Sequence, residues 1–168
     1  MTRDQFWSVI EAARRASGDD KPALLDALRD LLARRTPAEV RDFKRHLRDL
    51  LDEAYTWDLW GAAFLMNGGC SDDAFEYWRA WLIAQGCEVY QAALRDPETL
   101  ARSRLWFGAP EEYELESLLY VADEVHEDLT GGGIDLPAAP GAETPRGRPW
   151  AEEDLAARFP ALSEKFPY

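Results

Sequence analysis

The charged side chains whose spacing suits chemistry lie close together in residues 57–82 of the 168-residue chain. Asp72, Glu76 and Arg79 are spaced i, i+4 and i+7, so a helix through them places all three on one face. On that face Arg79 can form an ion pair with either acid, or bind a ligand carboxylate through two parallel hydrogen bonds. Asp73 is turned about 100° away and can face a different neighbour.

Asp58 supplies a further carboxylate from the segment before this helix. Asp72 or Asp73 acting with Asp58 in one pocket would form a general acid/base pair if their pKa values were pushed apart. In the structural interpretation, Asp72 and Asp73 are acids of the first helical turn, where they complement the helix dipole. Arg79 then has a structural role and links neighbouring elements. The structural interpretation is favoured for Asp73, whereas both remain open for Asp72 with Arg79.

Two glycines and a serine separate the halves of this stretch. Gly68 and Gly69 tolerate positive φ at a helix end and let a ligand approach the backbone closely. Ser71 is a residue type that caps the start of a helix. The candidate ligand-binding residues are therefore Trp57, Asp58, Gly68, Gly69, Ser71, Asp72, Asp73, Glu76 and Arg79.

Metal and cofactor binding have little support in the residue spacing. His46 and His126 belong to no HxxxH pattern, and the acids form no EF-hand loop. Cys70 precedes a helix N-terminus, which would lower the pKa of its thiol, but nearby carboxylates oppose the thiolate. No P-loop, dinucleotide-binding or hydrolase signature occurs. We expect no metal, no cofactor and an unreactive, buried Cys70, and no catalytic residue is assigned.

Helical periodicity dominates the chain, and no run of alternating apolar and polar residues predicts a strand. Thr2 with Gln5 has the spacing of a capping box, and residues 36–39 combine an N-cap, a proline and an acid. Helices are predicted at about residues 3–16, 22–35, 37–54, 57–67, 72–85, 87–95, 96–104 and 110–128.

Aromatic residues repeat at helical spacing on both sides of the Gly-Gly turn. Each side has an i, i+3, i+7 stripe, formed by Trp57, Trp60 and Phe64, and by Phe75, Trp78 and Leu82. Two such stripes joined by a short turn predict an αα-hairpin that packs on itself. We expect Trp60 and Trp78 in the core, whereas Trp57 and Trp81 lie near charged residues and can line a pocket wall.

The chain predicts an all-α, single-domain multi-helix bundle built around this central aromatic hairpin. A helical domain is expected at residues 1–130. Residues 131–149 are rich in Gly, Pro and Ala and predict an extended loop or arm. Residues 150–168 have apolar side chains at nearly helical spacing and are expected to dock on the domain.

The charge balance limits the classes of partner. Asp and Glu outnumber Lys and Arg by 32 to 19, which gives a net charge of −13 that repels nucleic acids and anionic membranes. No apolar run approaches the about 18 residues that a membrane span needs. With only two cysteines, no signal-like segment and this acidic composition, we expect a cytoplasmic protein. We expect it to be a monomer or a homodimer.

Two runs, WDLWGAA at 57–63 and GGCSDD at 68–73, carry a family resemblance. The chain resembles the bacterial domain-of-unknown-function family 4240 over about residues 1–128. Further matching positions are Phe6-Trp7, Phe75, Arg79-Ala80-Trp81-Leu82-Ile83, Gln85-Gly86 and Asp96-Pro97. The resemblance implies a small, all-helical, bacterial cytoplasmic protein whose domain also occurs beside other modules in regulators, and it implies no reaction. Trp78 departs from the phenylalanine expected in relatives.

The sequence favours a non-catalytic bacterial cytoplasmic binding or interaction module that recognises a protein or a small polar ligand. The alternative is a small enzyme that uses the Asp58, Asp72, Asp73 and Arg79 cluster for acid/base chemistry on a small polar substrate. A third possibility is a structural protein that oligomerises through an exposed apolar patch.

Overall fold

The computed structural model describes residues 1–107, 113–137 and 142–167. In chain order its α-helices and 3₁₀ helices (η) are α1 (Arg3–Ser17), α2 (Lys21–Ala33), α3 (Pro37–Glu53), α4 (Trp57–Asn67), α5 (Asp72–Ala84), α6 (Cys87–Arg95), α7 (Thr99–Arg102), η1 (Glu116–Leu119), α8 (Val121–Thr130), η2 (Glu152–Asp154), α9 (Leu155–Arg158) and α10 (Pro160–Lys165).

Side-chain caps set where the first helices begin. Thr2 and Gln5 form the predicted capping box at α1, and Thr36 and Glu39 form the same arrangement at α3. Asp20 caps α2, with its carboxylate accepting a hydrogen bond from the third helical N–H. These local contacts explain why the sequence located the starts of α1 and α3 correctly.

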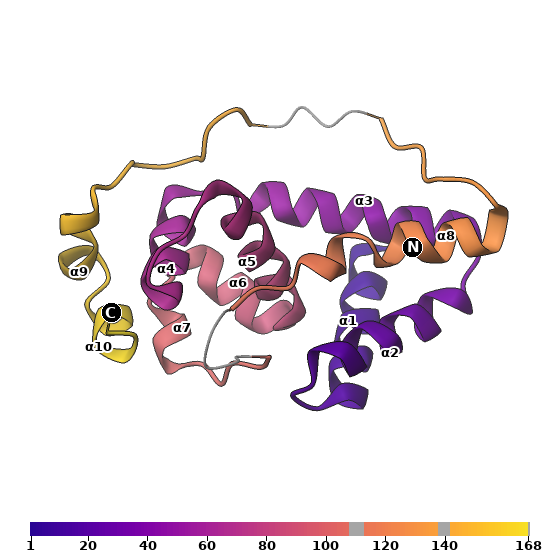
Figure 1. Cartoon of the computed structure of the whole chain (residues 1–168), viewed down its shortest axis with the longest axis horizontal. Helices are drawn as coiled ribbons and strands as arrows, with labels where there is room; N and C mark the ends of the chain where they lie inside the picture. The colour runs from indigo at the N-terminus through magenta and orange to yellow at the C-terminus, as the bar shows by residue number, and fades with distance from the viewer. Residues whose placement is uncertain (108–112, 138–141, 168) are drawn as a thin grey trace.

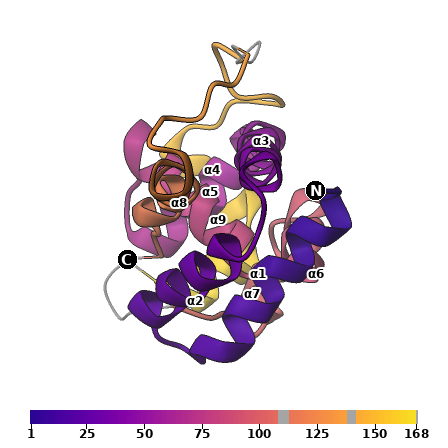
Figure 2. The ribbon, with the colours of Figure 1, turned by 90° about the vertical axis from the view of Figure 1, so that its right-hand side faces the viewer.

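The helices pack as a bundle in which α3 is the longest described helix. α8 lies beside α3 and α2, while α1 packs on α2, so these four helices form one end of the molecule in Figure 1. Figure 2 looks at the molecule from that end, where α3 and α8 are seen nearly end-on. α5 packs on α3, α4, α6 and η1 and so occupies the centre of the body.

Aromatic packing holds α4 and α5 together, as predicted. Trp60 stacks on Phe75 across the hairpin with ring centroids 5.1 Å apart and planes inclined by 9°. Trp78 and Trp81 are both fully buried and lie 5.8 Å apart. Trp81, which the sequence left undecided between core and pocket wall, is therefore a core residue, and its Nε1 donates to the Trp106 carbonyl at 3.0 Å.

The predicted long helix at residues 110–128 is confirmed only from Val121 onward, and the described residues before it do not form a continuous α-helix. Its expected start lies outside the described residues, and the chain then runs without helix to Leu115, through η1, and into α8 at Val121. Leu115 leaves the helical region with φ −148° and ψ 62°, and its N–H donates to the Tyr77 carbonyl at 3.0 Å. The hydrogen bond to α5 replaces a local helical one, which the apolar periodicity could not indicate.

Residues 131–149 connect α8 to the C-terminal helices, and their described parts run across the α3 side of the body (Figures 1 and 2). Arg146 forms a parallel bridge with Thr56, in which its N–H donates to the Tyr55 carbonyl at 3.0 Å. Its own carbonyl accepts from the Trp57 N–H at 2.9 Å. The segment is thus attached to the loop between α3 and α4.

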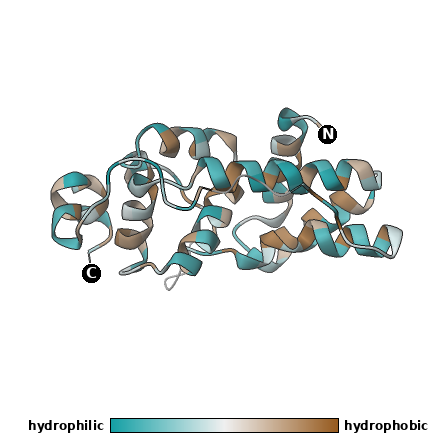
Figure 3. Cartoon of the chain, turned by 90° about the horizontal axis from the view of Figure 1, so that it is seen from above, coloured by the Kyte–Doolittle hydropathy of each residue, from teal (hydrophilic) through white to brown (hydrophobic). Residues whose placement is uncertain are grey.

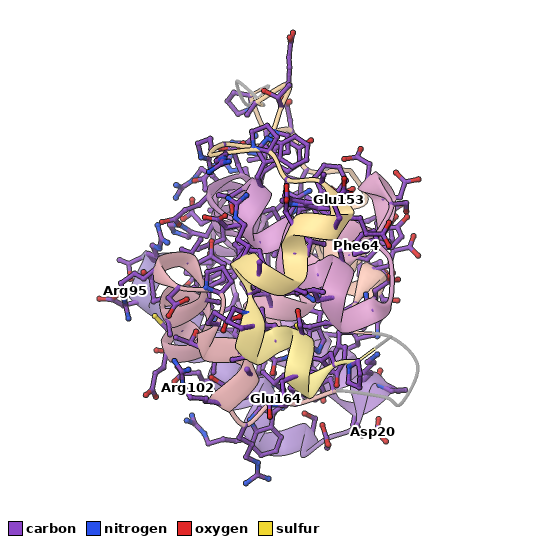
Figure 4. All side chains as sticks on the ribbon, turned by 90° about the vertical axis from the view of Figure 1, so that its left-hand side faces the viewer. Asp20, Phe64, Arg95, Arg102, Glu153 and Glu164 are labelled. Carbon is purple, nitrogen blue, oxygen red and sulfur yellow. The ribbon has the colours of Figure 1, made fainter. Side chains whose placement is uncertain are left out.

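The last residues pack against α4 and α7 (Figure 4). A glycine at position 61 permits this contact, because a Cβ there would lie 2.7 Å from Phe159 and 3.0 Å from Leu155. The Glu98 carboxylate accepts hydrogen bonds from the N–H groups of Ala161 and Leu162 at 2.8 and 3.2 Å. The start of α10 therefore has a tertiary cap supplied by a distant residue.

The described residues form an all-α, single-domain helical bundle, which confirms the predicted fold class. Hydrophilic and hydrophobic residues alternate around the helices in Figure 3, as expected where one face of each helix packs inward. One continuous core includes residues from α1 to α10. Within the described ranges, every helix is too short or too polar to cross a membrane.

Candidate functional site

A turn of two glycines and a serine leads into α5. Gly68 ends α4 in the left-handed conformation, with φ 66° and ψ 34°, and Gly69 follows with φ 131°. The Ser71 hydroxyl then accepts a hydrogen bond from the Ala74 N–H at 3.2 Å. The glycines make the reversal possible and Ser71 caps α5, so each has a structural role in placing the helix.

Arg79 projects from α5 into the body and is only 9% exposed. Its Nη1 donates to the Leu51 carbonyl at 2.7 Å, and its Nε donates to the Phe75 carbonyl at 3.3 Å. The guanidinium carbon lies 4.7 Å from the Tyr55 ring centroid and 4.8 Å from that of Phe75. Two carbonyls and two aromatic rings therefore fix the orientation of this cation.

Arg79 forms no ion pair with any carboxylate in the described ranges, so the proposed bridges to Asp72 and Glu76 are not made. Burial lowers the pKa of Arg79. The negative charge of Glu76, and to a smaller extent that of Asp72, opposes this lowering. Arginine nevertheless stays protonated in proteins. A buried positive charge thus remains without a direct counter-ion among the described residues.

A pocket of about 330 Å³ opens where α5 faces the end of α3. Its lining residues are Arg48, Leu51, Asp52, Tyr55, Asp72, Glu76, Arg79 and Ala142. The volume falls at the lower end of the about 300–1,000 Å³ range of small-molecule sites. We call it the Arg79 pocket; it brings three of the sequence candidates, Asp72, Glu76 and Arg79, to one concave surface.

Two further charged residues of the Arg79 pocket are held by the 131–149 segment. Asp52 forms an ion pair with Arg146 at 3.6 Å. Arg48 donates from Nη1 to the Pro137 carbonyl at 2.6 Å, yet its Nε is buried without a hydrogen-bond partner. An unsatisfied buried donor is unfavourable, while the Nη2 of the same guanidinium lies 3.8 Å from a carboxylate oxygen of Asp49.

Tyr55 forms a wall of the Arg79 pocket between the charged groups. Burial raises the pKa of its hydroxyl, and the negative charge of Asp72 raises it further, while the positive charge of Arg79 lowers it. The hydroxyl is therefore a neutral donor and acceptor at physiological pH. The hydroxyl is influenced by the carboxylate of Asp72 and the guanidinium of Arg79, which are both candidates for contacting a ligand.

A second hollow continues from the Arg79 pocket and shares Arg48, Leu51 and Glu76 with it. It measures about 280 Å³ and reaches Leu119 and the half-exposed Tyr120. The two hollows form a groove along α3, with a charged part at Arg79 and a more apolar part toward η1.

The remaining sequence candidates lie outside the Arg79 pocket. The carboxylate of Asp58 forms an ion pair with Arg158 of α9. Trp57 stacks on Trp60 with centroids 5.4 Å apart, and its carbonyl accepts from Trp150 at 2.7 Å. Both residues therefore help to hold the C-terminal segment.

Asp73 is exposed in the first turn of α5 and is not among the residues lining the Arg79 pocket. Its position at the start of the helix is the one that the structural interpretation assigns to it. Of the four residues in the acid/base hypothesis, only Asp72 and Arg79 share the pocket.

Sequence reasoning missed Arg48, Asp52 and Tyr55. Arg48 and Asp52 are spaced i, i+4 near the end of α3, which is part of the one-face pattern that drew attention to Asp72, Glu76 and Arg79, and Tyr55 follows in the loop after α3. The spacing of these residues is visible in the sequence, but no local pattern indicates that this part of the chain packs against α5.

Cys70 is partly buried behind the Gly-Gly turn. Burial raises the pKa of its thiol to about 12, and the negative charge of Glu114 contributes in the same direction. The thiol is therefore protonated at neutral pH and poorly nucleophilic. No group of three or more His, Cys, Asp or Glu side chains within the described ranges is arranged to hold a metal ion.

Comparison with known proteins identifies the family and no activity. No curated protein and no solved structure gives a significant match to the chain. The family model described as "Protein of unknown function (DUF4240)" matches residues 1–128. This match ends within α8, so the 131–149 segment and the C-terminal helices lie beyond it. The chain belongs to the domain-of-unknown-function family 4240.

Proposed function

We propose that this protein is a non-catalytic binding module that takes a small polar ligand in the Arg79 pocket. The observation that carries the proposal is the state of Arg79: it is buried, oriented by two carbonyls and two aromatic rings, and without an ion pair among the described residues. A fixed and desolvated guanidinium is well suited to bind a ligand acceptor, because little reorganisation is needed.

The two exposed acids on the same helix complete the recognition surface. Asp72 and Glu76 lie one helical turn apart at the pocket mouth, and the described residues provide neither with an ion pair. Exposed carboxylates without an ion pair can accept hydrogen bonds from hydroxyl or amino groups of a ligand. A polar ligand is therefore favoured over an apolar one.

Catalysis by the Asp58, Asp72, Asp73 and Arg79 cluster has less support. The carboxylate of Asp58 is engaged by Arg158, and Asp73 does not line the pocket. An acid/base pair would need two carboxylates that converge on one substrate. We therefore favour binding over this alternative.

We also propose a bacterial cytoplasmic setting. The thiols of Cys70 and Cys87 are unbridged, which fits a reducing compartment. The excess of acidic residues disfavours nucleic acid as the partner.

The proposal is tested by screening the full chain against a panel of polar metabolites for thermal stabilisation, followed by calorimetric titration of each hit. Asp72→Asn and Glu76→Gln should weaken the binding of a true pocket ligand about tenfold or more, the equivalent of one lost charge-assisted hydrogen bond. Asp73→Asn is the matched control, because it removes the same charge from the adjacent residue outside the pocket. Circular dichroism checks that each variant is folded.

Two results would contradict the proposal. One is a panel without a single stabilising compound. The other is a set of hits whose affinity changes equally in the Asp72→Asn and Asp73→Asn proteins, because such binding would follow overall charge and not the pocket.

A further inference from the structure

The Arg79 pocket combines cationic donors with anionic acceptors, one of which, Asp72, also forms a hydrogen bond with the Tyr55 hydroxyl. On the donor side, the Nη2 of Arg79 has no acceptor among the described residues, and the Nε of Arg48 is buried without a partner. On the acceptor side, Asp72 and Glu76 have no cationic partner in the described ranges. A ligand with only one sign of charge would satisfy one group and be repelled by the other.

The positive charge of Arg79 lies deeper in the pocket than the negative charges of Asp72 and Glu76. Arg79 is 9% exposed and lies at the base of the pocket, whereas Asp72 and Glu76 are exposed residues at its mouth. An anionic group of the ligand would therefore enter first and reach the guanidinium in a partly desolvated place, where a charge-assisted pair is stronger than in water. A cationic group would remain near the mouth, facing the two carboxylates.

The other charged groups that face the pocket do not change this pattern. Asp52 forms an ion pair with Arg146 at 3.6 Å. Arg48 donates from Nη1 to the Pro137 carbonyl, and its Nη2 lies 3.8 Å from a carboxylate oxygen of Asp49. The guanidinium of Arg48, which lines the pocket, still adds a second positive charge on the anion-binding side.

We infer that the ligand is a small zwitterion of the amino-acid type, with its carboxylate on Arg79 and Arg48 and its ammonium group on Asp72 and Glu76. This inference rests on the proposed function and deepens it by naming the ligand class. The pocket volume of about 330 Å³ suits a single small metabolite and not a long peptide. The groove toward Leu119 and Tyr120 gives room for a side chain.

The test uses the full chain and the twenty standard α-amino acids in calorimetric titrations. For the tightest binder, two matched compounds are compared: the amine that lacks its carboxylate, and the carboxylic acid that lacks its amine. The intact amino acid should bind at least about tenfold more tightly than either, because each matched compound forfeits one charge-assisted interaction.

Two variants separate the ends of the ligand. Asp72→Asn should weaken the amino acid and the amine but not the carboxylic acid. Arg48→Gln should weaken the amino acid and the carboxylic acid but not the amine, and it leaves the hydrogen bonds of Arg79 to the helices intact. Asp73→Asn should change none of the three affinities.

The outcomes distinguish the inference from the proposed function. If the amine alone binds as tightly as the amino acid, or if only neutral polyols or nucleosides bind with sensitivity to Asp72→Asn, the zwitterion assignment is wrong while the binding function stands. If no amino acid and no compound of the wider polar panel binds, both are wrong.

Discussion

The guanidinium of Arg79 donates to the main-chain carbonyl of Leu51 across 2.7 Å and so connects α5 to the last turns of α3. That carbonyl lies near a helix end, where the helix itself leaves carbonyl groups unsatisfied. The contact therefore serves two purposes: it caps part of α3 from a distance, and it holds the charged end of Arg79 at the pocket.

Arg79→Lys should destabilise the protein even though the charge is kept. A lysine has a single ammonium group and cannot reach the Phe75 and Leu51 carbonyls as a fork, so at least one hydrogen bond to a charged donor is lost. The expected decrease in the free energy of unfolding is about 1.5–3 kcal/mol, measured by urea denaturation. Arg45→Lys, at an exposed ion pair, should change it by less than about 0.5 kcal/mol. Equal effects of the two substitutions would show that the buried contact is unimportant.

Ser71→Ala should lower the free energy of unfolding by about 1 kcal/mol, within a range of about 0.5–2 kcal/mol, because the N-cap of α5 is lost. Ser71→Asn should retain most of the stability, since asparagine caps helices as well as serine does. Once a ligand is known, neither substitution should change its affinity by more than the small effect of altered folding. A large loss of affinity in the stable Ser71→Asn protein would instead make Ser71 a ligand contact.

Gly61→Ala should loosen the C-terminal segment. The new Cβ would lie 2.7 Å from the Phe159 ring, closer than carbon atoms can pack, so the side chains of Phe159 and Leu155 must move away from α4. Hydrogen exchange at the amides of residues 155–162 should become faster, while exchange within α1 to α3 stays unchanged. Gly132→Ala is the control, because only the Thr130 hydroxyl lies near its Cβ position, at 4.0 Å. Unchanged exchange at residues 155–162 would contradict the close packing of this segment.

Alkylation of Cys70 should be slow at neutral pH and accelerate only as the pH approaches about 12, the value to which burial raises the pKa of this thiol. Mass spectrometry of iodoacetamide-treated protein distinguishes its modification from that of Cys87. A rate that levels off near pH 9 would show that the thiol ionises as it does in an unfolded chain.

The same shift has a consequence for stability. The unfolded protein loses this proton near pH 9 and the folded protein near pH 12, so the contribution of Cys70 to folding is constant below pH 9 and decreases as the pH rises between these values. Cys70→Ala should therefore make the free energy of unfolding less sensitive to pH in that interval, as measured by urea denaturation at several pH values.

The sequence alone located most helices, because their limits depend on neighbours a few residues apart. Thr36 with Glu39, and Ser71 with its first-turn acids, were recognisable caps that the structure confirms. The aromatic hairpin followed equally from i, i+3, i+7 spacing. The interruption of the helix predicted at residues 110–128 could not be read from the sequence, because the Leu115 N–H donates to the carbonyl of Tyr77 in another helix.

For the Arg79 pocket, the sequence by itself determined which charges share a face of α5, because helical geometry places Asp72, Glu76 and Arg79 together. Only the tertiary structure decided what that face meets. It brought the end of α3 against α5, gave Arg79 the carbonyl of Leu51 in place of an acid, and diverted Asp58 to Arg158, which lies 100 residues further along the chain. Spacing encodes the face of a helix, whereas the partner of that face depends on how distant apolar surfaces pack, and no local pattern contains that information.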